Sequence, residues 1–476
     1  MTAPSTSPRR RDTLIVLAAA LLARLAVVAW AAPRFPPTAD GTFYHRIAER
    51  VAAGLGYTWL WPDGVVTYAA HYPVGYPALI GGAYALFGAH PGVAMLMNAV
   101  LGALAAVAVH RLAARAVSPG PALAAGLLVA LHPGLVAYTP ALMSEGVTAA
   151  LVTCAAWAAA WLRDAVPLGA PRTIVARVVV LGVVVGLATL VRPQSLVFAP
   201  LFALLALAPL AGRRAGWKAL GFAALATAFA LAVCAPWTAR NCERMNRCAL
   251  VSVNGGWNLL IGADPASTGA WSPIKVPDAC REVWDEAGKD ACFGRAAALY
   301  ITEHPGAWLS LVPRKLAATF DYCGAAGWYL HESNGAACDD TCKLVLGVVE
   351  TLYERLVLAL SLVGLALAAP AARGRKIATR LVVALGIVFL FQTHAWVAYL
   401  ALVVAALFGG RSLLRGPVLP AAAVIVLGAT LLTHAVFFGA GRYGLVTFPL
   451  IAGMAGMVFA WRREPERSSA VAADPA

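Results

Sequence analysis

The sequence predicts an all-α membrane protein that crosses the lipid bilayer about twelve times. Hydrophobic residues make up 61% of the 476 residues and charged residues only 13%, whereas a soluble domain carries roughly 25% charged residues. Many stretches of about 17–22 residues lack charge almost entirely, which is the length that a helix needs to cross the hydrocarbon core. Only helices and closed barrels satisfy their backbone groups in lipid, and runs this rich in Ala, Leu and Val favour helices.

The formal net charge of +14 has a simple explanation in such a protein. Cytoplasmic loops of membrane proteins accumulate Lys and Arg, and the basic clusters of this chain fall between apolar runs. We therefore expect membrane lipids, and no nucleic acid, among its partners. The expected spans are residues 13–32, 91–112, 121–138, 141–162, 174–191, 195–211, 218–236, 345–369, 377–393, 394–409, 417–438 and 443–461.

Charge decides whether residues 73–90 form a further span. If this segment does not cross, the clusters of Lys and Arg fall on the side of the N-terminal Arg9–Arg11 run; if it crosses, every later cluster up to the tail moves outside. The positive-inside rule therefore predicts a juxtamembrane or re-entrant element, and its prolines and glycines predict an irregular backbone. Both termini, with Arg462, Arg463 and Arg467, then lie in the cytoplasm.

This topology divides the chain into four parts. Residues 1–236 form an N-terminal membrane module whose first outside loop spans 33–90, and residues 237–344 form a large outside loop. Residues 345–463 form the C-terminal membrane helices, and 464–476 a cytoplasmic tail. Ala29 and Ala31 leave a cleaved signal peptide as an alternative, but the apolar run is long for one and favours an uncleaved anchor.

Seven of the nine cysteines lie in the large outside loop. Such clustering in an exported loop indicates disulfides in an oxidising compartment. Zinc is the alternative, but no C-x2-C spacing occurs. We expect at least two disulfides, with Cys338–Cys342 and Cys280–Cys292 as candidate pairs; the complete connectivity does not follow from the sequence.

Asp40 begins a short amphipathic segment just after the first span. Phe43, Ile47 and Val51 follow at four-residue intervals and predict one apolar helix face. Asp is a preferred helix N-cap, so the residues alone favour a capping role for Asp40. The alternative is chemistry, because this carboxylate lies where a lipid-linked substrate would present its headgroup.

Three further charged residues lie beside spans on the same predicted side. Glu145 is near the outer end of the fourth span, where an acid is costly and commonly functional, although an exposed loop acid remains the alternative. Arg192 and Arg442 are isolated cations. Each either reaches for lipid headgroups or binds phosphate, which Arg does with two parallel hydrogen bonds.

Six stretches resemble the GT-C membrane glycosyltransferases, in particular the bacterial branch similar to protein O-mannosyltransferases and the aminoarabinose transferase of lipid A. The stretches follow the order of that family over most of the chain: "ADGTFYHRIAERVAAGLGY" (39–57), "HYPVGYPALIGGAYALFG" (71–88), "YTPALMSEGV" (138–147), "LVRPQ" (190–194), "PWTARN" with "NGGWNLLIGADPASTGAW" (236–271) and "GRYGLVTFPL" (441–450).

This resemblance implies a GT-C-like fold and an inverting transfer of a sugar from an isoprenyl-phosphate donor of the undecaprenyl or decaprenyl type. It places the catalytic acid at Asp40, a later acid at Glu145, and donor-phosphate binding at Arg442 and Tyr443, with Arg192 as a further candidate. Many relatives carry a second acid after the first, where this chain has Gly41; any role for a paired carboxylate is therefore open.

The resemblance also sets the expected location and partners. The active site would face the periplasm or exterior of the inner membrane, and the acceptor would be a glycan, lipid or protein. No nucleotide-binding motif occurs in a suitable context; no metal ligands stand out, and a divalent cation is the one cofactor left open. The alternative functions are a lipid or sugar transporter or flippase, and a catalytically inactive relative.

Overall fold

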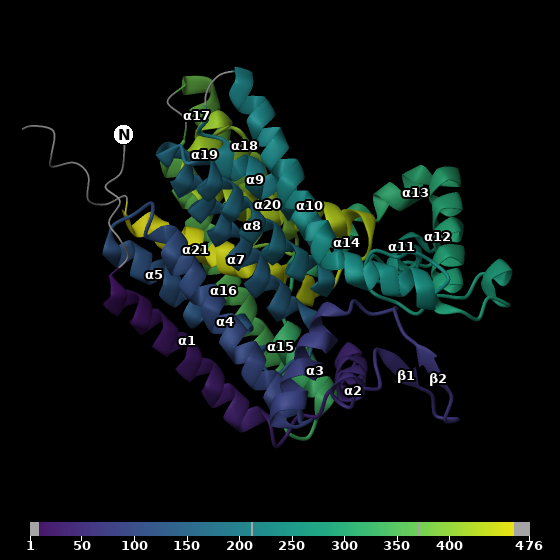
Figure 1. Cartoon of the computed structure of the whole chain (residues 1–476). Helices are drawn as coiled ribbons and strands as arrows, with labels where there is room; N and C mark the ends of the chain where they lie inside the picture. The colour runs from purple at the N-terminus through teal and green to yellow at the C-terminus, as the bar shows by residue number, and fades with distance from the viewer. Residues whose placement is uncertain (1–8, 211–212, 370–371, 461–476) are drawn as a thin grey trace, which may run out of the picture.

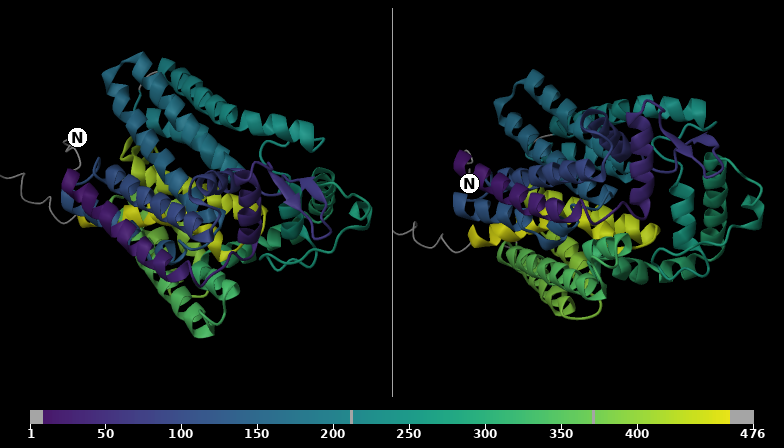
Figure 2. Two further views of the ribbon diagram at one scale, coloured as in Figure 1. Left: turned by 60° about the horizontal axis from the view of Figure 1, so that its bottom comes forward. Right: turned by 90° about the horizontal axis from the view of Figure 1, so that it is seen from below.

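The computed structural model describes residues 9–210, 213–369 and 372–460. It is a bundle of helices with a smaller group of elements at one end (Figure 1). In all three views, this end gathers α2 (Asp40–Ala52), α3 (Gly75–Phe87), the hairpin of residues 58–68 and the segment from α11 (Gly255–Ala263) to α13 (Pro305–Ser310). The start of α1 (Arg10–Ala31) and the last turn of the described chain lie at the opposite end (Figure 2). The predicted tail and its arginines lie outside the described residues.

Among the described residues, six helices are long and apolar enough to cross a membrane: α1 (Arg10–Ala31), α4 (Pro91–Ala113), α7 (Ser144–Ala165), α8 (Pro171–Val191), α10 (Arg213–Arg244) and α20 (Val418–Val436). The chain is therefore an integral membrane protein. The count of twelve spans, the sidedness of the loops and the position of the termini remain predictions.

Helices lie at the other predicted spans as well, but several are short. The span expected at 121–138 is two helices, because His132 and Pro133 interrupt it and a proline ring displaces the preceding turn. The two helices of this divided span are α5 (Pro119–Ala130) and α6 (Pro133–Ala137). The helices at the other predicted spans are η2 (Pro193–Val197) with α9 (Phe198–Leu207), α16 (Asp340–Leu367), α17 (Arg373–Leu390), α18 (Trp396–Leu407), η4 (Gly441–Val446), α21 (Phe448–Met457) and η5 (Val458–Ala460). Short connectors are η1 (Val166–Leu168) and α19 (Arg411–Arg415).

The prediction of an irregular backbone at 73–90 is wrong. Residues Gly75–Phe87 form a regular helix, α3, which packs against α2 (Asp40–Ala52), α4 and α8. Thirteen residues extend only about 20 Å, too short to cross the hydrocarbon core alone. Gly75 is required because a Cβ there would lie 2.6 Å from the backbone of Leu190 on α8.

The fold is not entirely α-helical. Strands β1 (Thr58–Leu60) and β2 (Val66–Tyr68) form an antiparallel hairpin with Thr58 opposite Tyr68. Its turn carries Asp63, whose carboxylate accepts a hydrogen bond from the backbone N–H of Val65 at 3.0 Å. The hairpin projects from the bundle beside the α11–α13 group (Figure 1).

Residues 237–344 carry short helices between two long ones. Because α10 continues to Arg244 and α16 begins at Asp340, both predicted limits of this part fall inside helices; backbone hydrogen bonding continues where the sequence becomes polar. The division into four parts therefore stays a prediction. The short elements are α11 (Gly255–Ala263), η3 (Asp278–Cys280), α12 (Glu286–Glu303), α13 (Pro305–Ser310), α14 (Val312–Phe320) and α15 (Ala325–Ser333).

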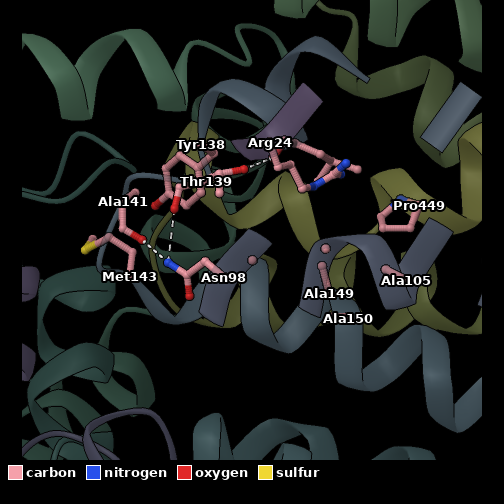
Figure 3. A pocket seen from close by; sticks show the side chains of 13 residues that line it. Arg24, Asn98, Ala105, Tyr138, Thr139, Ala141, Met143, Ala149, Ala150 and Pro449 are labelled. Carbon is pink, nitrogen blue, oxygen red and sulfur yellow. Dashed lines mark hydrogen bonds between the residues drawn. The ribbon is translucent and has the colours of Figure 1, made fainter. Parts of the chain in front are cut away.

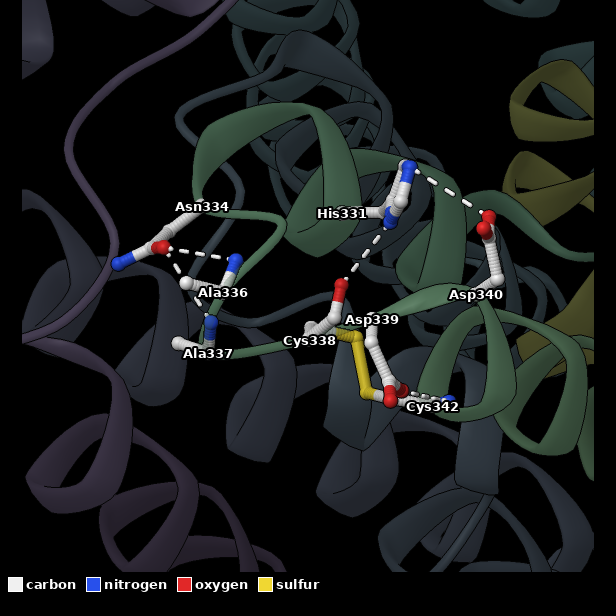
Figure 4. Close-up of a disulfide and its surroundings, with 8 residues drawn as sticks. All are labelled: His331, Asn334, Ala336, Ala337, Cys338, Asp339, Asp340 and Cys342. Atoms are coloured by element: carbon white, nitrogen blue, oxygen red, sulfur yellow. Dashed lines mark hydrogen bonds and ion pairs between the residues drawn. A yellow bond between two sulfur atoms is a disulfide. The ribbon is translucent and has the colours of Figure 1, made fainter.

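Three disulfides form in this part, and they confirm the expected disulfide framework. They join Cys242 to Cys248, Cys280 to Cys292, and Cys338 to Cys342. The remaining cysteine of the seven, Cys323, is free and buried. Figure 4 shows the Cys338–Cys342 bond at the turn between α15 and α16, where His331 Nδ1 lies 3.0 Å from the Cys338 carbonyl oxygen. The bond fixes the entry of the chain into α16.

The membrane bundle packs through small side chains. Its largest buried cluster consists mainly of Ala, Val and Leu from α1, α4, α5, α7 to α10, α14, α16 to α18, α20 and α21. On α8, Gly182 and Gly186 face α10, and a Cβ at Gly182 would lie 2.5 Å from the carbonyl oxygen of Ala226. Small residues four apart let two membrane helices approach closely. This packing holds α7, α8 and α20 rigidly where their ends carry the polar residues described next.

Candidate active site

Asp40 is not a helix cap. Helix α2 begins at Asp40 itself, its N-cap position is Ala39, and no side chain caps the helix. The Asp40 carboxylate faces other segments instead: Oδ2 lies 2.9 Å from Nη1 of Arg442, and Oδ1 accepts a hydrogen bond from the Tyr72 hydroxyl at 3.2 Å. The capping role is therefore wrong, because the side chain turns away from the first amides of its own helix.

Glu145 binds both arginines singled out from the sequence. Its Oε1 lies 2.5 Å from Nη2 of Arg192 and 3.3 Å from Nε of Arg442, and its Oε2 accepts a hydrogen bond from the Tyr138 hydroxyl at 3.2 Å. The side chain is 1% exposed. The alternative of an exposed loop acid is therefore wrong, and so is headgroup snorkelling by the two arginines.

Tyr443 supports the arginine pair. The guanidinium carbons of Arg192 and Arg442 lie 5.1 and 5.2 Å from the centre of its ring, within the range of cation–π attraction. The ring also stacks in parallel on His434, with centroids 4.4 Å apart, and lies 5.8 Å from the ring of Phe438. Tyr443 thus forms a wall that fixes the position of two cations.

Local sequence explains how these side chains are aimed. Arg192 precedes Pro193, and the residue before a proline is driven into an extended conformation; Arg192 has φ −144° and ψ 114°, which ends α8 and turns the side chain toward α7. Its Nε donates to Ser144 Oγ at 3.0 Å. Glu145 sits in the first turn of α7, where the helix dipole favours a carboxylate. Arg442 and Tyr443 lie in η4, directly after Gly441.

Tyr72 and His71 connect the group of charged residues around Glu145 to the segment 237–344. Burial, together with the nearby Asp40 carboxylate, raises the pKa of Tyr72 above its ordinary value, so its hydroxyl keeps the proton that it donates. Burial also lowers the pKa of His71. The backbone N–H groups of Ala70 and His71 donate to Oε2 of Glu286 at 2.7 and 3.0 Å. The first polar segment and α12 are therefore held together directly beside the site.

Gly41 does not leave a place for a second acid. A Cβ at this position would lie 2.9 Å from the Tyr329 hydroxyl and 3.0 Å from the carbonyl oxygen of Leu142. That hydroxyl accepts the backbone N–H of Leu142 at 3.2 Å, so the wall is packed and hydrogen-bonded. A side chain here would enter that wall, which accounts for the glycine at this position.

A separate cavity, seen in Figure 3, is lined by Ala149 and Ala150 of α7 and by Tyr138, the hydroxyl partner of Glu145. Asn98 donates from Nδ2 to the carbonyl oxygens of Thr139 and Ala141 at 3.1 and 3.0 Å, and Tyr138 reaches from this cavity to Glu145. At its far end, Arg24 donates to the carbonyl oxygen of Ala130 at 2.9 Å. Arg24 therefore caps the C-terminus of α5.

The structure brings all five predicted site residues together. Tyr72 and Tyr138 are the hydroxyl partners of the two acids, and neither stands out in the sequence. Tyr72 lies in the stretch 71–88, but nothing in that stretch distinguishes it from the other tyrosines there. Within the described ranges, no three side chains of His, Cys, Asp or Glu are grouped as a metal ion would need.

Comparison with known proteins gives one family match. Residues 71–239 match the model of the dolichyl-phosphate-mannose-protein mannosyltransferase family. The match confirms the resemblance to GT-C membrane glycosyltransferases of the protein mannosyltransferase type. It includes Glu145 and Arg192, but Asp40, Arg442 and Tyr443 lie outside the matched residues. No curated protein matches the chain.

Two solved structures are similar to this chain in part. One is the oligosaccharyltransferase AglB from Archaeoglobus fulgidus in complex with an inhibitory peptide and a dolichol-phosphate, with a TM-score of 0.48 and 15% identity over 94% of this chain and 50% of that one. The other is ArnT from Cupriavidus metallidurans bound to undecaprenyl phosphate, with a TM-score of 0.39 and 16% identity over 93% and 77%. The chain spans about half the length of AglB.

Proposed function

We propose that the protein is an inverting glycosyltransferase that moves a sugar from an isoprenyl-phosphate donor to an acceptor on the outer face of the membrane. The observation that carries this proposal is the chain of contacts Asp40–Arg442–Glu145–Arg192 at one end of an apolar bundle. It places one partly exposed carboxylate beside two cations. A base next to a phosphate-binding pair is what transfer from a lipid phosphate requires.

Asp40, Arg442 and Arg192 have different roles in this reaction. The acceptor oxygen forms a bond to the anomeric carbon, the bond from that carbon to the phosphate oxygen breaks, and its electron pair stays on the lipid phosphate. Asp40 takes the proton of the acceptor, because its carboxylate is 29% exposed. Arg442 and Arg192 stabilise the charge that grows on the departing phosphate.

Glu145 is a positioning residue in this proposal rather than a base. Its 1% exposure keeps acceptors away, and both of its oxygens already have partners. It holds the two guanidinium groups side by side before the donor arrives. Pre-organised charge of this kind needs no rearrangement during the reaction.

The test uses the full chain in liposomes with labelled polyprenyl-phosphate sugars and a cell-envelope extract as acceptor. We expect labelled product and free polyprenyl phosphate. Asp40→Asn should reduce transfer by roughly 10²–10⁴-fold. The matched control is Asp63→Asn in the exposed hairpin turn, which keeps an oxygen for Val65 and should transfer normally.

The outcome also separates the alternatives. A flippase would move the labelled lipid across the bilayer without cleaving it, and an inactive relative would bind it without turnover. Full activity of Asp40→Asn would exclude Asp40 as the base.

A further inference from the structure

Helix α16 carries two buried acids that the proposed reaction does not use. Glu350 is 1% exposed and Glu354 is 0% exposed. Both fall within the expected span 345–369, where an acid is costly and commonly functional. They are four residues apart, so they lie on the same face of α16. Helix α16 packs against α6 and α15, and the role of the two acids follows from what these short helices carry.

Glu354 fixes the start of α6. Its Oε2 lies 3.0 Å from Nε2 of His132, and neither side chain is exposed. His132 is the N-cap of α6, and its Nδ1 accepts a hydrogen bond from the backbone N–H of Leu135 at 3.5 Å. Since a backbone N–H only donates, the Nδ1 atom carries no proton and Nε2 is the donor to Glu354. The carboxylate therefore holds the ring in the orientation that caps α6.

Glu350 supports the middle of α6. A Cβ at Gly134 would lie 2.7 Å from Cγ of Glu350 and 2.8 Å from its Cδ and Oε1. Helix α6 therefore rests directly on this side chain, and only glycine allows so close an approach. The backbone N–H groups of Ala325 and Ala326, at the start of α15, face the same carboxyl group, where the helix dipole favours an acid. Glu350 thus lies between α6 and α15.

Helix α6 ends at the tyrosine that binds Glu145. It has only five residues, and Tyr138 is its C-cap. The backbone N–H of Tyr138 donates to the carbonyl oxygen of Gly134 at 3.0 Å, so the position of Gly134 sets that of Tyr138. On α15, the ring of Tyr329 lies 6.3 Å from the ring of Tyr138. A helix this short is not stable by itself, so its contacts with α16 determine where it lies.

We propose that Glu350 and Glu354 are positioning residues of the candidate active site; the inference rests on the proposed function. Through α6, they hold the Tyr138 hydroxyl against Oε2 of Glu145, to which it donates at 3.2 Å. Glu145 in turn holds the two arginines that bind the donor phosphate. When α6 shifts, Glu145 loses this hydrogen bond and the arginine pair loses its fixed spacing. The chain of contacts from Glu354 through His132 and Tyr138 is continuous, as coupling between distant groups requires.

The experiment measures binding of bare polyprenyl phosphate by the full chain in nanodiscs. Gly134→Ala inserts one methyl group between α6 and Glu350 and should weaken binding about fivefold, within the range for coupling through packed side chains. Glu354→Leu removes the acceptor of His132 and should have a similar effect. Glu354→Gln keeps an oxygen for His132 and should restore most of the affinity.

Combination with Tyr138→Phe separates positioning from a general effect on the fold. If α6 acts through the Tyr138 hydroxyl, Gly134→Ala and Glu354→Leu should weaken binding no further once that hydroxyl is absent. Changes that act through one shared contact are not additive, whereas independent changes are. A residue that only stabilises the fold would have the same effect with and without the hydroxyl.

Two variants serve as matched controls. Gly428→Ala on α20 also adds a methyl group to a helix, but a Cβ there meets no atom within 4 Å. Ser361→Ala removes another buried hydrogen bond of α16, which runs to the carbonyl oxygen of Ile451 on α21 at 3.0 Å. Both should bind polyprenyl phosphate normally. Thermal unfolding in detergent shows whether each variant is folded; if Glu354→Leu is not, Gly134→Ala decides the test.

Two results overturn the inference. One is normal affinity for polyprenyl phosphate in folded Gly134→Ala and Glu354→Leu variants. The other is an equal loss of affinity with and without Tyr138→Phe, which would assign the two acids to the fold alone. In both cases the wild type still binds the lipid and the proposed function stands. A wild type that binds no polyprenyl phosphate would contradict the proposed function itself, and the positioning role with it.

Discussion

Replacing Glu145 by Gln should separate a group that holds arginines from a group that takes a proton. Gln keeps the size of the side chain and one carbonyl oxygen, but it removes the negative charge that faces Arg192 at 2.5 Å and Arg442 at 3.3 Å. The carboxylate of Asp40 then has to balance the charges of both Arg192 and Arg442. Position 145 is buried, because its side chain is only 1% exposed.

The expected cost follows from these contacts. Removing one partner of a buried ion pair costs about 3–5 kcal/mol. Arg442 keeps its contact with Asp40, and Arg192 is 13% exposed, so we expect the lower end, about 3 kcal/mol of unfolding free energy. Affinity for polyprenyl phosphate should fall as well, since the two guanidinium groups repel each other and separate.

The assays are unfolding in mixed detergent micelles and binding of bare polyprenyl phosphate, with sugar transfer measured in parallel. Asp40→Asn is the comparison, because it should retain lipid binding and lose transfer. A Glu145→Gln variant with normal stability and normal lipid affinity, but without transfer, would refute the positioning role and make Glu145 the base.

Three further predictions concern Arg442, Gly41 and the membrane topology. Arg442→Ala should weaken binding of polyprenyl phosphate, and Arg442→Lys should restore it only in part, because an ammonium group cannot replace a planar fork; unchanged affinity of the Ala variant would count against phosphate binding. Gly41→Asp should cost about 1–3 kcal/mol by overpacking and should not raise activity, as thermal unfolding and transfer assays can show; a stable and more active variant would reopen the paired-acid mechanism. In intact cells, a single cysteine at position 115 should resist an impermeant maleimide and one at position 270 should react; labelling at 115 would mean that α3 crosses the membrane.

The composition of the candidate site was predictable, but its contacts were not. Asp40, Glu145, Arg192 and Arg442 each stand out because a charge beside an apolar run is costly and has to be explained. Their pairing depends on how α2, α7, α8 and η4 meet at one end of the bundle, and no local pattern encodes it. The capping interpretation of Asp40 was wrong for this reason: the preference of Asp for helix starts is real, but Arg442, about 400 positions later in the sequence, competes for the same carboxylate.

Local sequence patterns also do not encode every detail of the helices, which explains where the fold differs from the prediction. Hydropathy located the apolar segments, but it does not mark where a helix breaks or continues. His132 and Pro133 divide one expected span, whereas α10 and α16 extend beyond theirs because backbone hydrogen bonding continues in polar surroundings. For 73–90, prolines and glycines predicted an irregular backbone, yet Pro77 lies within the first turn of α3, where a proline is tolerated.

The charges of the site imply an order of events. Asp40 and Glu145 balance Arg442 and Arg192, so the group is neutral before a substrate arrives, and Arg442 serves both acids. A donor phosphate adds negative charge and competes with Asp40 for Nη1 of Arg442, whereas the shorter Arg192–Glu145 contact lies deeper. Once Arg442 turns to the phosphate, the Asp40 carboxylate loses its strongest partner and keeps only the Tyr72 hydroxyl at 3.2 Å. We therefore expect Asp40 to become an effective base only when a donor is bound, which ties proton transfer to the presence of the leaving group.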